Sequence, residues 1–148
     1  MIECVRRIQF CAGHRVWKHE SKCAHPHGHN YVLFIHANAS QLDDVGRVID
    51  FSVLKEKIGG WVDRFWDHGF IYNENDIEMC TIFRDSGYKS FEMSGNPTAE
   101  NMAKFIALQV APNQLHGSNV RVRKVVLWET ENCFASYELA DGVFQSYE

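Results

Sequence analysis

The chain has 148 residues, a formal net charge of −4, and 45% hydrophobic against 23% charged residues. A chain of this length and ordinary globular composition can bury a hydrophobic core as a single domain, residues 1–148, without the help of disulfides. Its acidic balance argues against nucleic acids and anionic membrane surfaces as partners.

The location of the protein is predicted from what the sequence lacks and from its cysteines. It has no apolar run of the roughly 18 residues that cross a membrane, and its N-terminus has no signal-peptide core. The cysteines are five in number and irregularly spaced. That pattern suits free thiols in a reducing compartment better than a disulfide framework. We therefore expect a cytoplasmic protein.

The first half of the chain predicts two strands and a helix. Residues 2–12 alternate between apolar and polar, which is typical of a strand with one buried face, and residues 15–26 form a loop. A second strand is predicted over residues 29–39, and its apolar middle favours a central position or burial in an assembly. Asp50 is a suitable N-cap for an amphipathic helix that reaches Phe65, and Gly59-Gly60 predict a break or kink within it.

The second half predicts a short strand at residues 70–72, an acidic loop at 73–78, and short strands at 81–83 and 88–93. A second amphipathic helix starts near Pro97, is capped by Thr98 or Asn96, and is expected to stop at Pro112. Strands at 120–130 and 133–139, joined by a tight turn at Glu131-Asn132, complete the chain. This order predicts an α+β domain whose helices lie on one face of an antiparallel sheet.

Histidines are concentrated where the first loop meets the second strand. Four of them fall within eleven residues, at His19, His25, His27 and His29, and His14 ends the first strand. On a strand His27 and His29 share a face, and a hairpin-like pairing brings His14 to the same point. Three neutral imidazoles at one point form a zinc site with an open fourth position, as catalytic zinc requires.

Two other interpretations of the histidines are a polar surface loop and a structural zinc knot that includes Cys23. Structural sites usually contain two or more cysteines, which favours the catalytic site. Pro26 disrupts strand pairing beside His25, so neither His25 nor His19 is included in the ligand set.

Three further places carry side chains suited to chemistry, and each also has a purely structural interpretation. Cys23, beside Lys22, is either an inert buried thiol or a thiolate that acts as nucleophile or proton acceptor. Asp67-His68 is either a helix end, where a histidine meets the helix dipole, or a carboxylate-oriented imidazole that relays protons. Glu129 is either an exposed carboxylate or a buried one that pairs with the parallel N–H donors of a guanidine-like heterocycle.

Several short motifs occur in a fixed order between about residues 6 and 139. They are Phe10-Cys11-Ala12-Gly13-His14, Cys23-x3-His27-Gly28-His29-Asn30-Tyr31, Gly46-Arg47-Val48-Ile49-Asp50-Phe51, Asp67-His68, Pro97-Thr98-Ala99-Glu100-Asn101 and Trp128-Glu129-Thr130. Together they resemble the 6-pyruvoyltetrahydropterin synthase / 6-carboxytetrahydropterin synthase family. The resemblance implies a tunnelling fold (T-fold), a four-stranded antiparallel sheet with two helices on one face. It also implies that three subunits close a barrel and that two trimers stack into a hexamer.

The resemblance implies specific roles for residues at an active site between subunits. The metal ligands would be His14, His27 and His29, and the metal would be zinc. The catalytic residues would be Cys23, Asp67 and His68, and Glu129 would bind the pterin substrate.

The implied substrate is 7,8-dihydroneopterin triphosphate. The queuosine-pathway enzymes of the family release acetaldehyde and triphosphate and form 6-carboxy-5,6,7,8-tetrahydropterin, whereas the biopterin-pathway enzymes keep the side chain as a pyruvoyl group. The three-residue gap between Cys23 and His27 resembles the queuosine-pathway enzymes. The expected activity is therefore that of a 6-carboxytetrahydropterin synthase; the alternatives are a 6-pyruvoyltetrahydropterin synthase and a non-catalytic pterin binder. Residues 69–96 depart from the family pattern, which indicates a divergent subgroup.

Overall fold

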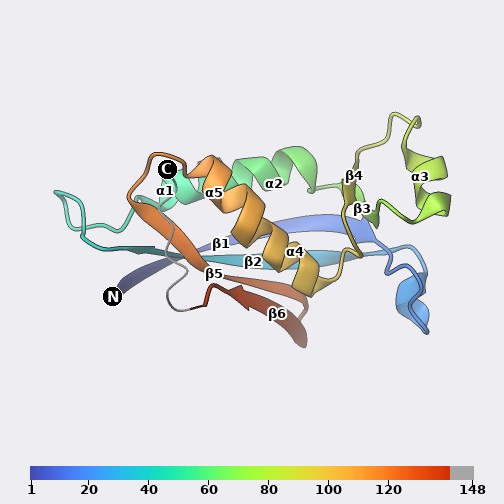
Figure 1. The fold of residues 1–148 in the computed structure, drawn as a ribbon, viewed down its shortest axis with the longest axis horizontal. Helices are drawn as coiled ribbons and strands as arrows, with labels where there is room; N and C mark the ends of the chain where they lie inside the picture. The colour runs from blue at the N-terminus through green and yellow to red at the C-terminus, as the bar shows by residue number, and fades with distance from the viewer. Residues whose placement is uncertain (141–148) are drawn as a thin grey trace.

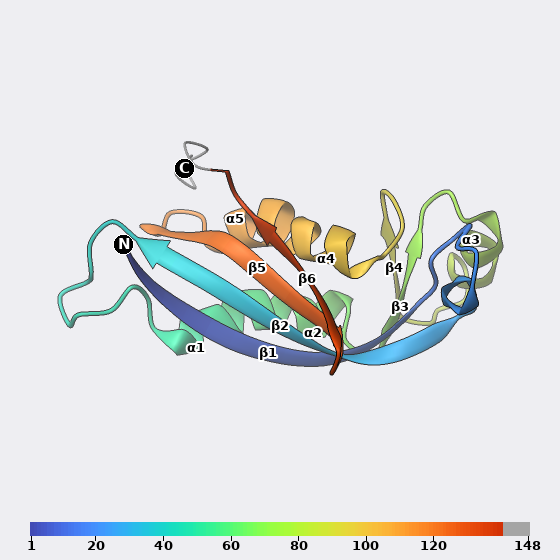
Figure 2. The ribbon, with the colours of Figure 1, turned by 90° about the horizontal axis from the view of Figure 1, so that it is seen from below.

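A twisted sheet with a helical layer on one face dominates the computed structural model, which describes residues 1–140 (Figures 1 and 2). The strands are β1 (Ile2–His14), β2 (His27–Ala39), β3 (Gly69–Asn73), β4 (Ser90–Met93), β5 (Val120–Thr130) and β6 (Cys133–Glu138). The helical segments are η1 (Lys22–Ala24), α1 (Phe51–Leu54), η2 (Lys55–Gly59), α2 (Gly60–Phe65), α3 (Ile77–Phe83), α4 (Ala99–Phe105), η3 (Ile106–Val110) and α5 (Ala111–Gln114). The predicted domain also includes residues 141–148, which lie outside the described residues.

Four of the strands form the antiparallel sheet that the sequence predicts. The strand order is β4-β3-β1-β2-β5-β6, and β1 pairs with β2 from Ile2↔Ala39 to His14↔His27. β2 pairs antiparallel with β5, and β5 with β6. The α+β fold is confirmed; β1 ends at His14, as predicted, and β2 begins at His27, two residues earlier than predicted. The hairpin therefore ends in a pair of opposed histidines.

The sheet has six strands, whereas the predicted fold has four. β3 pairs parallel with β1, and β4 pairs parallel with β3, so the sheet is mixed. The helix α3 lies between β3 and β4 in the sequence, and such a crossover returns the chain in the same direction. β3 brings the Asp67-His68 segment that precedes it to the edge of β1.

Two helical segments, residues 51–65 and 99–114, cover one face of the sheet (Figure 2). Alternate residues of the central strands are buried beneath them: Ile8, Phe10, Ala12, Tyr31, Leu33, Ile35, Ala37, Val120, Val122, Val125 and Leu127. Asp50 caps the first segment, accepting from Ser52 N at 2.8 Å. Thr98 caps the second, accepting from Asn101 N at 3.1 Å. Within the described residues no helix has the length and apolar character needed to cross a membrane.

Both predicted helix interruptions lie inside continuous helical segments. The helix runs through Gly59-Gly60, and the turn that ends at Gly59 is π-helical. The predicted stop at Pro112 is wrong, because the helix continues to Gln114. A π-helical turn, η3, directly precedes α5. Such a turn alters the hydrogen-bond ladder at the place where the proline ring would disrupt an α-helix.

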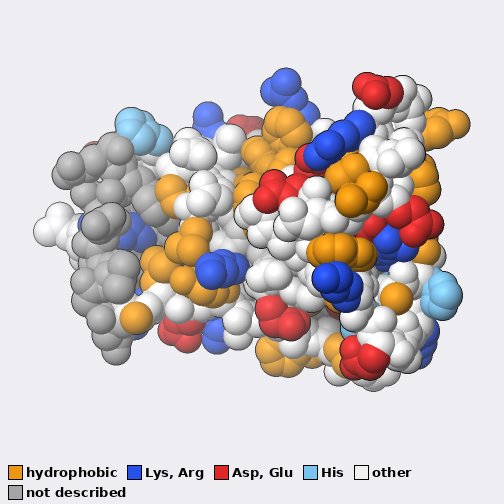
Figure 3. All heavy atoms as spheres, turned by 45° about the vertical axis from the view of Figure 1, so that its right-hand side comes forward, with side chains coloured by type: hydrophobic (Ala, Val, Ile, Leu, Met, Phe, Trp, Pro, Cys, Tyr) orange, Lys and Arg blue, Asp and Glu red, His pale blue; other side chains and the backbone are white. Residues whose placement is uncertain are grey.

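The prediction of a strand at residues 81–83 is also wrong, because these residues belong to α3. The fully buried Asp76 caps this helix through Met79 N at 3.2 Å and pairs with Arg15, whose Nε donates to Oδ2 at 2.6 Å. A contact between residues 61 positions apart has no local sequence signal. Figure 3 brings this end of the molecule forward and shows acidic and basic side chains mixed over it.

Gly13 lies against the ring of Phe70, which provides a test of the packing between β1 and β3. A Cβ at position 13 would be 2.7 Å from Phe70 Cδ2, and that ring is stacked on Phe83 at 4.7 Å between centroids. We expect Gly13→Ala to lower the free energy of unfolding in urea by about 1–3 kcal/mol. The control is Gly60→Ala, in a helix where a Cβ meets nothing within 4 Å, and it is expected to raise that free energy by about 0.5–1 kcal/mol. Stabilisation by both substitutions would contradict the described packing.

Candidate metal centre and proton-transfer site

The three predicted metal ligands converge at the end of the β1–β2 hairpin. His14 lies directly opposite His27, and His29 lies two residues further along the same face of β2. The Nε2 atoms of His14 and His27 are 3.1 Å apart. The three rings have centroid separations of 4.6, 4.8 and 5.1 Å. The hairpin register thus places three imidazoles around one point.

Backbone carbonyls hold two of these rings with Nε2 directed into the cluster. His14 Nδ1 lies 2.7 Å from Pro97 O, and His27 Nδ1 lies 2.6 Å from His25 O. An Nδ1–H that donates to a carbonyl leaves Nε2 free to bind a metal. In the described part of the chain, the buried His29 Nε2 has no hydrogen-bond partner. An orphaned nitrogen beside two oriented imidazoles fits a divalent ion that prefers nitrogen ligands.

Burial favours the neutral form of two of these histidines, His14 and His29. His14 is 1% exposed, and burial lowers its pKa to about 4, although the bond to Pro97 acts in the opposite direction. Burial also lowers the pKa of His29, against the charge of Glu129, which raises it. Neutral imidazole is the form that binds metal, so both rings are available as ligands at neutral pH.

Glu129 lies within the same cluster. Its Oε1 is 2.9 Å from His29 Nε2 and 3.8 Å from His14 Nε2. The potential ligand atoms of the four residues all lie within 4.8 Å of one another. The sequence predicted a carboxylate able to bind a heterocycle, but it did not predict that this carboxylate touches the metal ligands.

Asn96 fixes the loop that carries the carbonyl acceptor of His14. Its Oδ1 accepts from Trp17 N at 3.0 Å and from Asn73 Nδ2 at 3.1 Å, and its Nδ2 donates to Trp17 O at 2.9 Å. The next residue is Pro97, so Asn96 positions the acceptor. In the sequence Asn96 appeared only as a candidate helix cap, and a backbone carbonyl has no residue-type signal at all.

Asp67 and His68 form the predicted pair at the start of β3. Asp67 Oδ2 lies 2.8 Å from His68 Nδ1, and Asp67 Oδ1 accepts from Cys11 N at 2.9 Å. Partial burial by itself would raise the pKa of Asp67, but the bonds to Cys11 and His68 hold it below its usual value. The pair therefore consists of an ionised carboxylate that orients an imidazole. His68 is 78% exposed and has a left-handed φ of 60°, a conformation that often marks a functional site.

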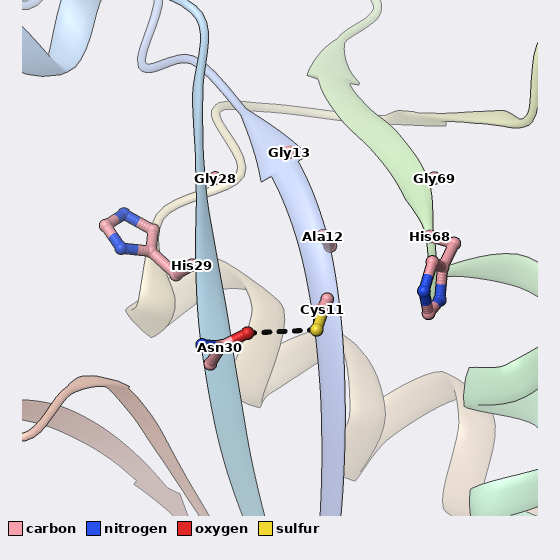
Figure 4. A pocket seen from close by; sticks show the side chains of 8 residues that line it. All are labelled: Cys11, Ala12, Gly13, Gly28, His29, Asn30, His68 and Gly69. Atoms are coloured by element: carbon pink, nitrogen blue, oxygen red, sulfur yellow. Dashed lines mark hydrogen bonds between the residues drawn. The ribbon is translucent and has the colours of Figure 1, made fainter.

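His68 opens into a recess of about 410 Å³ (Figure 4). The lining residues are Cys11, Ala12, Gly13, Gly28, His29, Asn30, His68 and Gly69. Cys11 Sγ donates to Asn30 Oδ1 at 2.9 Å. Sequence reasoning gave neither residue a role, although both lie within motifs that carry the family resemblance and alternate with the buried residues of β1 and β2.

The recess and the imidazole cluster lie mainly on different faces of the sheet. Cys11 and Asn30 alternate with His14 and His29 along their strands, so their side chains leave the opposite face. Figure 4 shows the His29 ring directed away from the Cys11–Asn30 pair, with His68 on the far side of β1. His68 therefore shares the recess with His29, but among the described residues no polar contact joins it to the cluster of its own chain.

Cys23 lies in η1 and is half-buried. Its carbonyl accepts from Val16 N at 2.8 Å, which ties the loop to the end of β1. Among the polar contacts described for residues 1–140, none joins its thiol to the imidazole cluster or to His68. The structure thus brings the three histidines together with Glu129, and Asp67 together with His68, while no described polar contact links the Cys23 thiol to either group.

The sequence matches a family model described as 6-pyruvoyl tetrahydropterin synthase over residues 3–140. A 6-carboxy-5,6,7,8-tetrahydropterin synthase from Rickettsia felis is 42% identical over 135 residues, which cover 90% of this chain and 98% of the relative. A protein of the same name from Aquifex aeolicus is 33% identical, with 92% of this chain and 97% of the relative covered.

Solved structures share the fold. An uncharacterized protein from Wolinella succinogenes superposes with a TM-score of 0.80 at 23% identity, covering 93% of this chain and 97% of the other. A 6-pyruvoyltetrahydropterin synthase from Caenorhabditis elegans superposes with a TM-score of 0.68 at 22% identity, covering 94% and 96%. At these identities the similarity supports the fold.

Proposed function

Because the chain belongs to the 6-pyruvoyl tetrahydropterin synthase family, we propose that it converts 7,8-dihydroneopterin triphosphate to 6-carboxy-5,6,7,8-tetrahydropterin, with release of acetaldehyde and triphosphate. The observation that carries this proposal is the convergence of His14, His27 and His29 beside Glu129. The names of the Rickettsia and Aquifex relatives support the carboxylated product. The three-residue gap between Cys23 and His27 supports it as well.

We assign zinc as the metal, with the Nε2 atoms of the three histidines as its ligands. A bound zinc would supply Lewis-acid polarisation of substrate oxygens. Imidazole nitrogens suit zinc among the divalent ions, and the neutral, carbonyl-oriented rings support this choice. The carbonyls of Pro97 and His25 keep the ligand nitrogens in place.

Cys23, Asp67 and His68 are the proposed catalytic residues. As a thiolate, Cys23 would take a proton from the substrate side chain, and the exposed His68, oriented by Asp67, would act as the second acid or base at Nε2. Glu129 would anchor the pterin, because a carboxylate accepts two parallel N–H donors from such a ring.

The active site is proposed to form between copies of the chain in a homo-oligomer, a trimer or a dimer of trimers. The position of His68 across β1 from the cluster supports a shared site. The half-buried Val32 and Phe34 on the uncovered face of β2 support closure of the sheets into a barrel, which would also remove exposed sheet edges. We further propose a cytoplasmic enzyme whose partner is the pterin substrate, with no nucleic acid or membrane involved.

The test is incubation of the zinc-loaded protein with 7,8-dihydroneopterin triphosphate, followed by mass spectrometry of the pterin and trapping of acetaldehyde. We expect 6-carboxytetrahydropterin and acetaldehyde in equal amounts. A pyruvoyl product without acetaldehyde would instead identify a 6-pyruvoyltetrahydropterin synthase. Tight pterin binding without turnover would identify a non-catalytic binder.

A further inference from the structure

Glu129 occupies an irregular position in the sheet. On β5, Trp128 pairs with Phe134 of β6 and Thr130 pairs with Cys133, so two steps along β5 match one step along β6. Glu129 is therefore the extra residue of a β-bulge. Bulges redirect a side chain and are frequent beside active sites. Here the bulge residue is the one whose carboxylate reaches the imidazole cluster.

Three of the separations between potential ligand atoms lie near the edge length of a tetrahedron around one ion, and all four atoms lie within 4.8 Å of one another. With metal–ligand bonds of about 2.0–2.2 Å, neighbouring ligand atoms in a tetrahedral site lie about 3.3–3.6 Å apart. The His14–His27 Nε2 separation is 3.1 Å, and Glu129 Oε1 lies 2.9 Å from His29 Nε2 and 3.8 Å from His14 Nε2. These distances bracket the expected edge, so the carboxylate oxygen lies close enough to His14 and His29 to share an ion with them.

The close approach of Glu129 to His29 is not a hydrogen bond. Although Glu129 Oε1 is only 2.9 Å away, the buried His29 Nε2 has no hydrogen-bond partner among the described residues. The two atoms are close without being aligned as donor and acceptor. A nitrogen and a carboxylate oxygen in this arrangement are both satisfied if they face a shared cation.

We propose that Glu129 is the fourth metal ligand before substrate binds, and that it leaves the metal when its carboxylate pairs with the N–H donors of a pterin ring. That a pterin displaces Glu129 rests on the proposed function. That Glu129 binds the metal does not. The carboxylate oxygen that departs is replaced by a water molecule or a substrate oxygen. Binding of a pterin would thus free one coordination position of the metal through a single side chain, Glu129.

The first test measures the affinity of the metal-depleted protein for Zn²⁺ and Co²⁺ by competition with a chelator. Glu129→Gln and Glu129→Asp are expected to bind both ions at least about tenfold more weakly than the native protein. Glu129→Asp keeps the negative charge but shortens the side chain. A loss of metal affinity in this variant therefore indicates direct ligation of the metal and not electrostatic attraction alone. The matched control is Glu131→Gln, in the exposed turn two residues away, which is expected to bind normally.

The second test follows the visible absorption of the Co²⁺-loaded protein, which reports the ligand set of the ion. Unsubstituted pterin, which has no side chain to reach the metal, is expected to change the spectrum of the native protein and not that of Glu129→Gln. Circular dichroism of the native protein and of Glu129→Gln would establish that both proteins are folded.

Native-like affinity in both Glu129 variants would overturn the ligand assignment, whatever products the enzyme makes. Reduced metal affinity in the variants, together with a native Co²⁺ spectrum that pterin does not alter, would support Glu129 as a metal ligand. The same result would overturn its release by pterin. Failure of the product assay would refute the proposed reaction and leave both metal results standing.

Discussion

Two inactive variants, Cys23→Ala and His68→Ala, are expected to restore activity when their subunits are combined in one oligomer. Each variant alone should lose about 10²–10⁴-fold in turnover, the usual contribution of a group that transfers a proton. His68 lies across β1 from the cluster of its own chain, so the proposed site takes His68 from one subunit and Cys23 from a neighbour. Random mixing in a ring then leaves about a quarter of the sites with both native residues.

The experiment uses co-expressed variants with different affinity tags, so that mixed oligomers can be purified and their turnover measured. His116→Ala, at an exposed position away from both groups, serves as the control and should keep native turnover. A mixture no more active than its parents would mean that each site is built within a single chain.

Substitution of His14 is expected to remove the metal. His14 is 1% exposed and bonds Pro97 O through Nδ1, so its Nε2 is the most tightly fixed of the three proposed ligand atoms. Loss of a ligand should cost more than the roughly 10–100-fold in affinity that loss of a supporting residue costs. Elemental analysis after dialysis should find His14→Ala nearly free of zinc, and turnover should fall with it.

Because His14 is buried, the partly exposed His27 provides a second variant that is less demanding for folding. His25→Ala is the control, since its side chain lies outside the cluster while its carbonyl remains available to His27. Native zinc content in both His14→Ala and His27→Ala would contradict the proposed ligand set.

The sequence predicted best those features that depend on short-range patterns. Alternation along two strands placed His27 and His29 on one face, and the β1–β2 register confirms that His14 joins them. Local capping chemistry located the start of the first long helical segment at Asp50 and narrowed that of the second to Thr98 or Asn96, of which Thr98 is the cap.

Features set by distant contacts could not be predicted in this way. The strand predicted at residues 81–83 is helical because Asp76 caps α3 and pairs with Arg15, far away in the sequence. The place of Glu129 beside His29 depends on a bulge that becomes visible only in the pairing with β6. The residue pattern predicted short strands near β3 and β4, but their parallel pairing depends on the crossover through α3.

Asn96 joins three parts of the chain: the segment after β1, the end of β3 and the start of α4. Its side-chain amide hydrogen-bonds Trp17 and Asn73, while the carbonyl of its neighbour Pro97 lies within hydrogen-bond distance of His14 Nδ1. Insertions and deletions between residues 74 and 95 should therefore be accepted only where the chain still returns to this anchor. Changes in length are expected in the loops on either side of α3 and β4, and a change at Asn96 itself is expected to release both the loop after β1 and the acceptor of His14.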